Sequence, residues 1–211
     1  MIMSRHHSNW PKNGRDSFKD RDRKIKPEQE PSGVIVEIYE DFLPVGVKSS
    51  GDYRKRYQVV TVVGTDKFSI LRIFMRKPLN TIARGETLDL NEQKANFQLV
   101  KKLRSSDWST ALKDDIEEII SQIIKKQEIK FVDFFNKAHA ITNRLHQLKL
   151  LPNVGEKRVI QILKIRDQQE FISFEDIEER VGLDPVDIIK KRILEELETD
   201  QKYILFTKKY D

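Results

Sequence analysis

The spacing of hydrophobic residues changes near residue 105, and this change divides the chain into two differently folded parts. The first part has short runs rich in Val, Ile, Phe and Tyr, separated by Gly, Pro and Asp. Such runs are typical of β-strands. We predict strands at residues 33–42, 57–64 and 68–75, with two weaker ones in the sequences GETLDL and NFQLVKKL. Five short strands, with the turn GTDK before the third, predict a small OB-like β-barrel over residues 32–104.

In the second part, apolar residues recur every three or four positions, which is the period of an amphipathic α-helix. The sequence ALKDDIEEIISQIIKKQ keeps this spacing, and FVDFFNKA and ITNRLHQLKLL are predicted to continue as helices. Ser173 followed by Asp176 forms a capping box, and Asp184-Pro185 opens a last helix through Leu197. The sequence KYILF is predicted as a terminal strand. The predicted domain at residues 105–211 is otherwise all-helical.

The predicted fold class is α+β, with the OB-like barrel followed by the helical domain. Residues 1–31 have no apolar periodicity and are predicted to be a disordered basic tail. No apolar run approaches the roughly 20 residues that span a bilayer, and the N-terminus lacks the apolar stretch of a signal peptide. The absence of cysteine excludes disulfides and thiolate nucleophiles. We therefore expect a soluble cytoplasmic protein without a membrane partner.

The sequence LKLLPNVGEKRVIQIL has the pattern of a helix-hairpin-helix motif, which we place at residues 141–166. The motif usually has two glycines around an apolar residue, and here Asn153 replaces the first while Gly155 keeps the second. Asn tolerates the left-handed backbone region better than other non-glycine residues. Val154 is expected to insert between the helices. Backbone N–H groups near Gly155, Lys157 and Arg158 would then face outward at a helix N-terminus, where they favour a phosphate oxygen.

The distribution of charge supports this interpretation. Residues 144–166 carry six basic residues against Glu156 alone, a net charge of +5, although residues 105–211 together have a net charge of −3. Contacts from the hairpin would bind the phosphate backbone of a nucleic acid and would not recognise individual bases. The alternative is an ordinary corner between two helices with solvated cations. The predicted hairpin contacts are Arg144, Asn153, Val154, Gly155, Lys157, Arg158 and Lys164.

A second, degenerate hairpin is predicted at residues 173–197, with Val181, Gly182 and Leu183 at its turn. Residues 167–200 hold twelve acidic and four basic residues, a net charge of −8. Such a surface would repel phosphate, so we expect this hairpin to be structural. The acidic face is also a candidate docking surface for a basic protein.

The predicted barrel offers another basic surface, because YRKRY places three cations between two aromatic residues. OB barrels bind single strands by stacking bases on aromatic side chains beside a basic groove. Since strand aromatics usually belong to the core, Phe68 and Phe74 are expected there. The predicted barrel contacts are Tyr53, Arg54, Lys55, Arg56, Arg72, Arg76 and Lys77.

The order of these segments resembles an archaeal family known as domain of unknown function number 655. The resemblance covers residues 33–206, and its most specific block is residues 141–182. It implies nucleic-acid or nucleotide binding, and the ribosomal-protein and rRNA-methyltransferase genes beside family members imply a ribosomal RNA setting. The chain departs from the family pattern at Asn153 and Val159. The family carries no agreed catalytic residues.

We therefore expect a non-enzymatic RNA-binding protein, associated with ribosomes or rRNA, that needs no cofactor or metal. The hairpin would hold backbone phosphates and the barrel a single strand. Because helix-hairpin-helix pairs serve duplex DNA more often than RNA, a DNA-binding protein of repair or replication is the alternative. A third hypothesis is a DNA glycosylase, with Lys157 and Asp176 as catalytic residues two and twenty-one positions after Gly155. The capping box already explains Asp176, which disfavours this enzyme.

Overall fold

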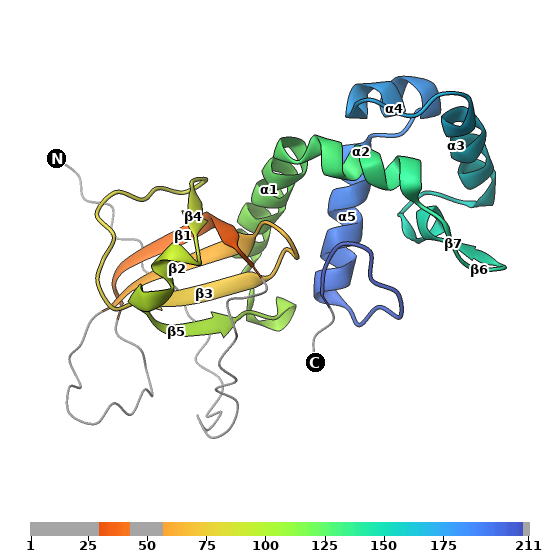
Figure 1. Cartoon of the computed structure of the whole chain (residues 1–211). Helices are drawn as coiled ribbons and strands as arrows, with labels where there is room; N and C mark the ends of the chain where they lie inside the picture. The colour runs from red at the N-terminus through yellow and green to blue at the C-terminus, as the bar shows by residue number, and fades with distance from the viewer. Residues whose placement is uncertain (1–29, 43–56, 209–211) are drawn as a thin grey trace.

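The computed structural model describes residues 30–42 and 57–208, which form an open β-sheet followed by a mainly helical half (Figure 1). The strand order is β4-β1-β2-β3-β5, and all neighbouring strands are antiparallel. Each strand lies within two residues of its predicted position. The strands are β1 (Ser32–Phe42), β2 (Tyr57–Gly64), β3 (Ile70–Met75), β4 (Thr87–Asp89) and β5 (Phe97–Lys102).

The sheet is not closed, so the predicted OB-like barrel is not confirmed. Strands β4 and β5 are its two edges, and no pairing joins them among the described residues. Strand β4 has only three residues and is followed by the 3₁₀ helix η2 (Glu92–Asn96), which leaves few backbone groups for closure. Instead of a closing strand, apolar side chains after β3, including Leu79 and Ile82, pack against the smaller cluster of buried side chains within the sheet.

A buried carboxylate fixes the start of the sheet. Glu30 is 2% exposed, and its oxygens accept hydrogen bonds from the backbone N–H groups of Asp66, Lys67 and Ser69 in the turn between β2 and β3. A Cβ atom at Gly64 would lie 2.0 Å from Glu30, so glycine is required for this approach. The prediction of a disordered tail is therefore wrong for its last two residues, and the remainder lies outside the described residues.

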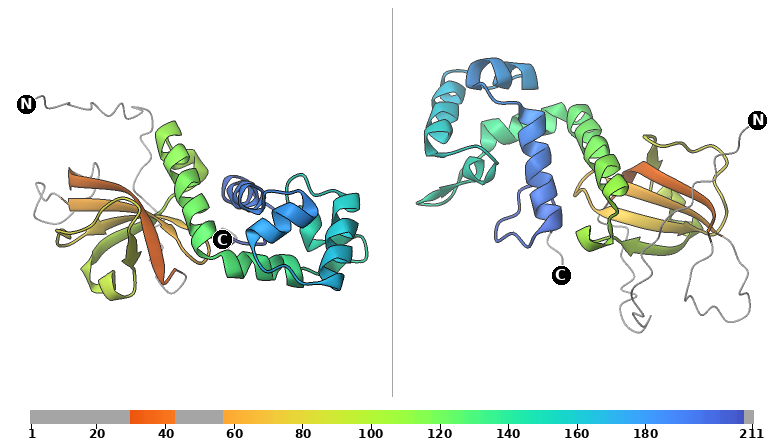
Figure 2. Two further views of the ribbon diagram at one scale, coloured as in Figure 1. Left: turned by 90° about the horizontal axis from the view of Figure 1, so that it is seen from above. Right: turned by 180° about the vertical axis from the view of Figure 1, so that it is seen from behind.

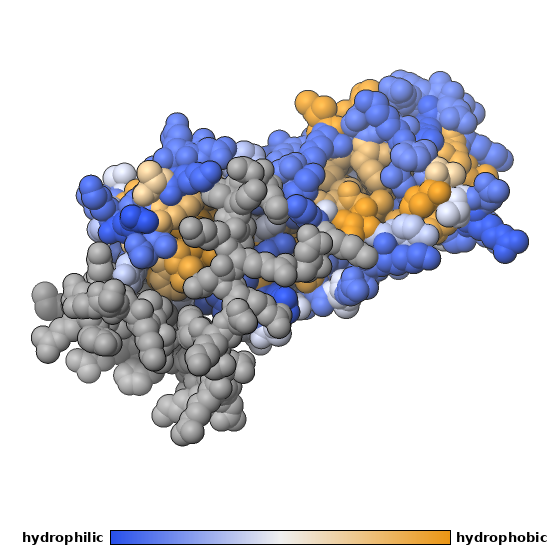
Figure 3. Space-filling view, turned by 60° about the horizontal axis from the view of Figure 1, so that its bottom comes forward, coloured by the Kyte–Doolittle hydropathy of each residue, from blue (hydrophilic) through white to orange (hydrophobic). Residues whose placement is uncertain are grey.

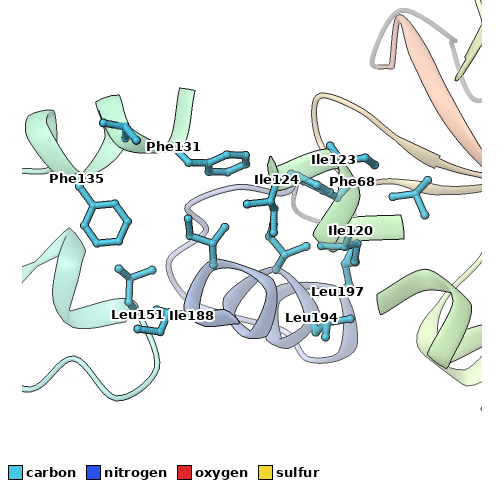
Figure 4. Close-up of a cluster of buried hydrophobic side chains, with 14 of the residues drawn as sticks. Phe68, Ile120, Ile123, Ile124, Phe131, Phe135, Leu151, Ile188, Leu194 and Leu197 are labelled. Atoms are coloured by element: carbon cyan, nitrogen blue, oxygen red, sulfur yellow. The ribbon is translucent and has the colours of Figure 1, made fainter. Parts of the chain in front are cut away.

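Helix α1 joins the two halves, because its apolar side chains pack against both the sheet and helix α5 (Figure 2). Figure 4 shows Phe68 from the β2–β3 connection, Ile120 from α1 and Leu197 from α5 in one cluster of buried side chains. No helix in the described part of the chain is long and apolar enough to cross a membrane. The helices are α1 (Thr110–Lys126), α2 (Glu128–Lys137), α3 (Glu156–Gln168), α4 (Phe174–Val181) and α5 (Pro185–Glu198).

The second half is not all-helical, which corrects the prediction for residues 141–151. This segment forms strands β6 (Ala140–Thr142) and β7 (Leu145–His146), followed by the 3₁₀ helix η4 (Gln147–Leu150). The β-branched pair Ile141-Thr142 favours a strand. The terminal strand predicted at residues 202–206 does not form either, since that segment pairs with no strand of the described residues and instead bonds to α5.

A buried ion pair on α5 holds this C-terminal segment in place. Arg192 is 4% exposed and Glu196 is 2% exposed, and the Arg192 Nε donates to Glu196 Oε1 over 2.8 Å. The Glu196 carboxylate also accepts the backbone N–H groups of Leu205, Phe206 and Thr207. Residues 205–207 are thus held by charge-assisted hydrogen bonds and not by pairing within a strand or helix.

Replacing Glu196 with Gln should lower the free energy of unfolding by about 3–5 kcal/mol, because it removes the buried counter-ion of Arg192 and leaves only the half-exposed Glu195 nearby. Urea unfolding followed by circular dichroism would measure the change. The matched control is Glu195→Gln, which removes a carboxylate that is 48% exposed and 3.5 Å from Arg192. This control should lose less than about 1 kcal/mol. Equal losses in the two variants would contradict the role assigned to Glu196.

Candidate nucleic-acid interface

Residues 151–155 form a tight turn that leads from η4 into α3. Asn153 has φ +61°, the left-handed conformation expected for the residue in this position. Val154 is 3% exposed and belongs to the main core together with Leu151, which Figure 4 shows at one end of the buried cluster. The first helix of the predicted motif is replaced by the 3₁₀ helix η4. The turn is therefore anchored from below by packing, although only its second helix is α-helical.

The N-terminus of α3 has unpaired backbone donors. Its N-cap residue is Gly155, which has no side chain to accept a hydrogen bond. The N–H of Arg158 bonds to the Gly155 carbonyl over 3.0 Å, so it does not face outward as predicted. Among described residues, none accepts from the N–H groups of Gly155, Glu156 or Lys157. Helices α1, α4 and α5 are capped by the side chains of Ser109, Ser173 and Asp184.

An open hollow lies at this helix end and is lined by Gly155, Glu156, Lys157, Arg158, Ile160 and Gln161. A Cβ atom built at Gly155 meets no other atom within 4 Å, and the φ of −81° is ordinary for any residue. The packing of the protein therefore does not require glycine at this position. An anion can approach the backbone here, at the positive end of the helix dipole.

Two arginines of the basic segment are engaged inside the protein. Arg158 donates to the carbonyl oxygen of Val181 at the end of α4. Arg166 donates to the carbonyl oxygens of Phe135 and Ala138 at the end of α2, each over 2.9 Å. Both guanidinium groups satisfy orphan carbonyls at helix C-termini. Arg158 was predicted as a phosphate contact; in the structure its guanidinium is bonded to the end of α4, while its half-buried side chain also lines the hollow.

The other predicted cations lie at the surface. The side chains of Arg144, Lys157 and Lys164 are exposed and form no ion pair with any described residue. Lys157 lies at the start of α3, Lys164 farther along it, and Arg144 beside β7. Lys149 was not among the predicted contacts, yet its Nζ lies 3.9 Å from Glu156 Oε2 at the start of α3. The concentration of positive charge in residues 144–166 was the sequence signal that could have identified Lys149.

His146 stabilises the approach to the turn and does not offer positive charge. Its Nδ1 accepts the N–H of Leu148 over 3.1 Å and thereby caps η4. Burial lowers the pKa of His146, and the neighbouring Arg166 and His139 lower it further. The neutral imidazole is the form that can accept this hydrogen bond.

The predicted barrel contacts are only partly within the described residues, because Tyr53, Arg54, Lys55 and Arg56 lie outside them. Arg72 faces Glu37, with 3.6 Å between guanidinium and carboxylate. The Tyr39 hydroxyl donates to the same carboxylate over 2.9 Å, and burial together with this bond raises the pKa of Tyr39 to about 12. Arg76 donates to a backbone carbonyl of β5, whereas the Lys77 side chain is exposed. Arg72 is therefore already neutralised by an internal partner.

Asp176, the proposed catalytic carboxylate of the glycosylase hypothesis, has structural partners. Its Oδ2 accepts the N–H of Ile172 over 3.1 Å and an N–H of Arg180 over 2.9 Å. Its backbone N–H is bonded to the Ser173 hydroxyl, as the capping box predicts. These hydrogen bonds explain the position of the Asp176 carboxylate by a structural role.

Comparisons with known proteins match both halves of the chain. The family described as "Protein of unknown function (DUF655)" matches residues 36–208. Uncharacterized protein MJ0038 of Methanocaldococcus jannaschii is 34% identical over 172 residues, which cover 80% of this chain and 77% of that protein. The crystal structure of Af1531 from Archaeoglobus fulgidus, a DUF655 protein, is similar with a TM-score of 0.68 at 32% identity. That similarity covers 85% of this chain and 100% of the Af1531 chain.

Replacement of Lys157 or Arg158 by alanine should have different effects on the free energy of unfolding. Arg158→Ala should lower the free energy of unfolding by about 1.5–3 kcal/mol, because the Val181 carbonyl loses a charged donor. Lys157→Ala should change it by less than about 0.5 kcal/mol, because its side chain is exposed and unpaired among the described residues. Urea unfolding of both variants would test this, and an equal effect would refute the division of roles.

Proposed function

The chain belongs to the archaeal DUF655 family of unknown function, and we propose that it is an RNA-binding protein that holds a backbone phosphate at the start of α3. The observation that carries this proposal is the set of unpaired N–H donors at residues 155–157, beneath an open surface at Gly155. Lys157 lies at the same helix end and adds positive charge, and Lys149 lies there in an ion pair with Glu156 over 3.9 Å. Phosphate is the anion that a nucleic acid presents to such a site.

A single phosphate at a helix N-terminus contributes little affinity, so further contacts along the strand are needed. Arg144 and Lys164 supply exposed cations on the elements that flank the turn. In the sheet half, the basic segment at residues 53–56 and the exposed Lys77 are proposed to contact a single strand. All of these contacts involve charged side chains or backbone groups of the protein. We therefore propose that it binds the phosphate backbone and does not recognise a particular base sequence.

The ribosomal setting implied by the family resemblance favours RNA over DNA, and the protein is proposed to act by binding, without a catalytic step. Competition of unlabelled structured RNA and duplex DNA for one labelled RNA would test the choice. Preferential displacement by structured RNA supports the proposal. Stronger displacement by duplex DNA would instead assign the site to DNA.

Lys157→Ala should weaken RNA binding and make it less sensitive to salt. Each phosphate contact on a single strand contributes about 0.7 to the slope of log affinity against log salt, through release of counterions. The variant slope should therefore be smaller by about 0.7, measured by fluorescence anisotropy between low and high salt. The control is Lys191→Ala, an exposed lysine paired with Asp187 in the acidic stretch of residues 167–200. An unchanged slope for Lys157→Ala would remove this residue from the interface.

Gly155→Asp should change stability and binding in opposite directions. An N-cap carboxylate should raise the free energy of unfolding by about 0.3–1 kcal/mol, since it accepts a free N–H and complements the helix dipole. The same group would occupy the phosphate position, so RNA affinity should fall about tenfold, equivalent to about 1.4 kcal/mol. A variant that is stabilised but binds RNA normally would contradict the proposed site.

A further inference from the structure

A second surface hollow lies between the start of the β6–β7 hairpin and residues 202–208. Its lining includes His139, Lys202 and Lys208, and none of its lining residues is acidic. In Figure 3 the molecule is turned so that the bottom of Figure 1 comes forward. Apolar side chains reach the surface of the helical half on this side, with hydrophilic side chains around them. The hollow thus combines apolar surface with positive charge.

Both walls of the hollow are held by hydrogen bonds to charged or amide side chains. One wall is the irregular C-terminal segment, whose N–H groups bind Glu196 and whose Tyr203 carbonyl accepts from Arg192. On the other wall, Gln147 accepts the N–H of His139 over 3.0 Å and donates its own backbone N–H to the His139 carbonyl over 3.0 Å. The hollow is therefore preformed, which lowers the entropy lost when a ligand binds.

The chemistry of the lining fits a nucleotide. The apolar residues Ile141, Ile204 and Leu205 and the Tyr203 ring offer surface to a base. The Lys202 Nζ lies over the Tyr203 ring, 5.3 Å from its centre, so that one face of the ring carries a cation and the other face is the one proposed for a base. Single-stranded nucleic acids bind where aromatic surfaces and cations occur together, because bases stack while phosphates are neutralised.

The wall of the hollow and the start of α3 are close in sequence, because η4 and a short turn join them. Gln147 in this wall begins η4, Lys149 lies two residues later, and Gly155 follows after the turn. Lys149 reaches the α3 end of this segment, since it lies 3.9 Å from Glu156. One strand can therefore contact positive charge at both ends of η4.

We propose that this hollow binds one nucleotide of the RNA strand whose backbone is held at α3. Lys202 and Lys208 contact its phosphates, and its base lies against Tyr203. This assignment rests on the proposed function and extends it to the β6–β7 hairpin and the C-terminal segment. It adds Lys202 and Lys208, which lie outside the basic segment of residues 144–166.

The test is the salt dependence of binding to a labelled single-stranded RNA of about 20 nucleotides, longer than the 4–16 nucleotides that a typical single-strand site occupies. The double variant Lys202→Ala/Lys208→Ala should lower the salt slope by about 1.4, the loss expected for two phosphate contacts. The control, Lys190→Ala/Lys191→Ala, removes the same charge from the acidic stretch of residues 167–200 and should leave the slope unchanged.

The outcomes separate the two proposals. If the unmodified protein binds and Lys157→Ala weakens it, but Lys202→Ala/Lys208→Ala does not, then the hollow is overturned and the α3 site stands. If both double variants weaken binding equally, the effect is general charge and the hollow is again overturned. If the unmodified protein shows no salt-sensitive RNA binding, the proposed function falls, and the hollow with it.

Discussion

The whole molecule depends on the two-sided burial of helix α1. Its six buried apolar residues are one leucine and five isoleucines, which contact the sheet on one side and α5 on the other. Isoleucine is stiff and only moderately favourable in helices, so this helix gains its stability from packing more than from intrinsic propensity. The two halves consequently share one core, which extends from Phe68 to the turn at Leu151 (Figure 4). The turn of the candidate site is therefore anchored in the same cluster of buried side chains that supports one side of the sheet.

Several charged side chains in the second half form hydrogen bonds to backbone groups that no helix or strand pairs. Arg158, Arg166 and Arg180 each donate to carbonyl oxygens at helix C-termini, and Arg192 donates to the carbonyl of Tyr203. Arginine suits this role because its planar guanidinium offers several donors and stays charged. Much of the positive charge in this half therefore has a structural role, and Arg144, Lys157 and Lys164 are the cations at the hairpin that form no ion pair with a described residue.

The strands and most helices could be predicted because each follows a local hydrophobic period or a local start signal, such as Ser173 or Asp184. The open sheet could not, since closure depends on pairing between the distant strands β4 and β5. Residues 141–151 were misread because leucines at 145, 148, 150 and 151 imitate a helical period. The positive φ of Asn153 was predictable from residue type, whereas the internal role of Arg158 depends on Val181, which no local pattern connects to it.

The two buried carboxylates impose an order on folding during synthesis. Glu30 precedes the N–H groups that it binds by 36 to 39 residues, and Glu196 precedes its backbone partners by 9 to 11 residues. Each carboxylate is therefore synthesised before its donors, and neither can form its final hydrogen bonds until the later segment has been added. The sheet can complete this contact once Ser69 has emerged, but α5 can bury Glu196 in its final state only after Thr207. The wall of the second hollow is consequently among the last parts of the described fold to form on a growing chain.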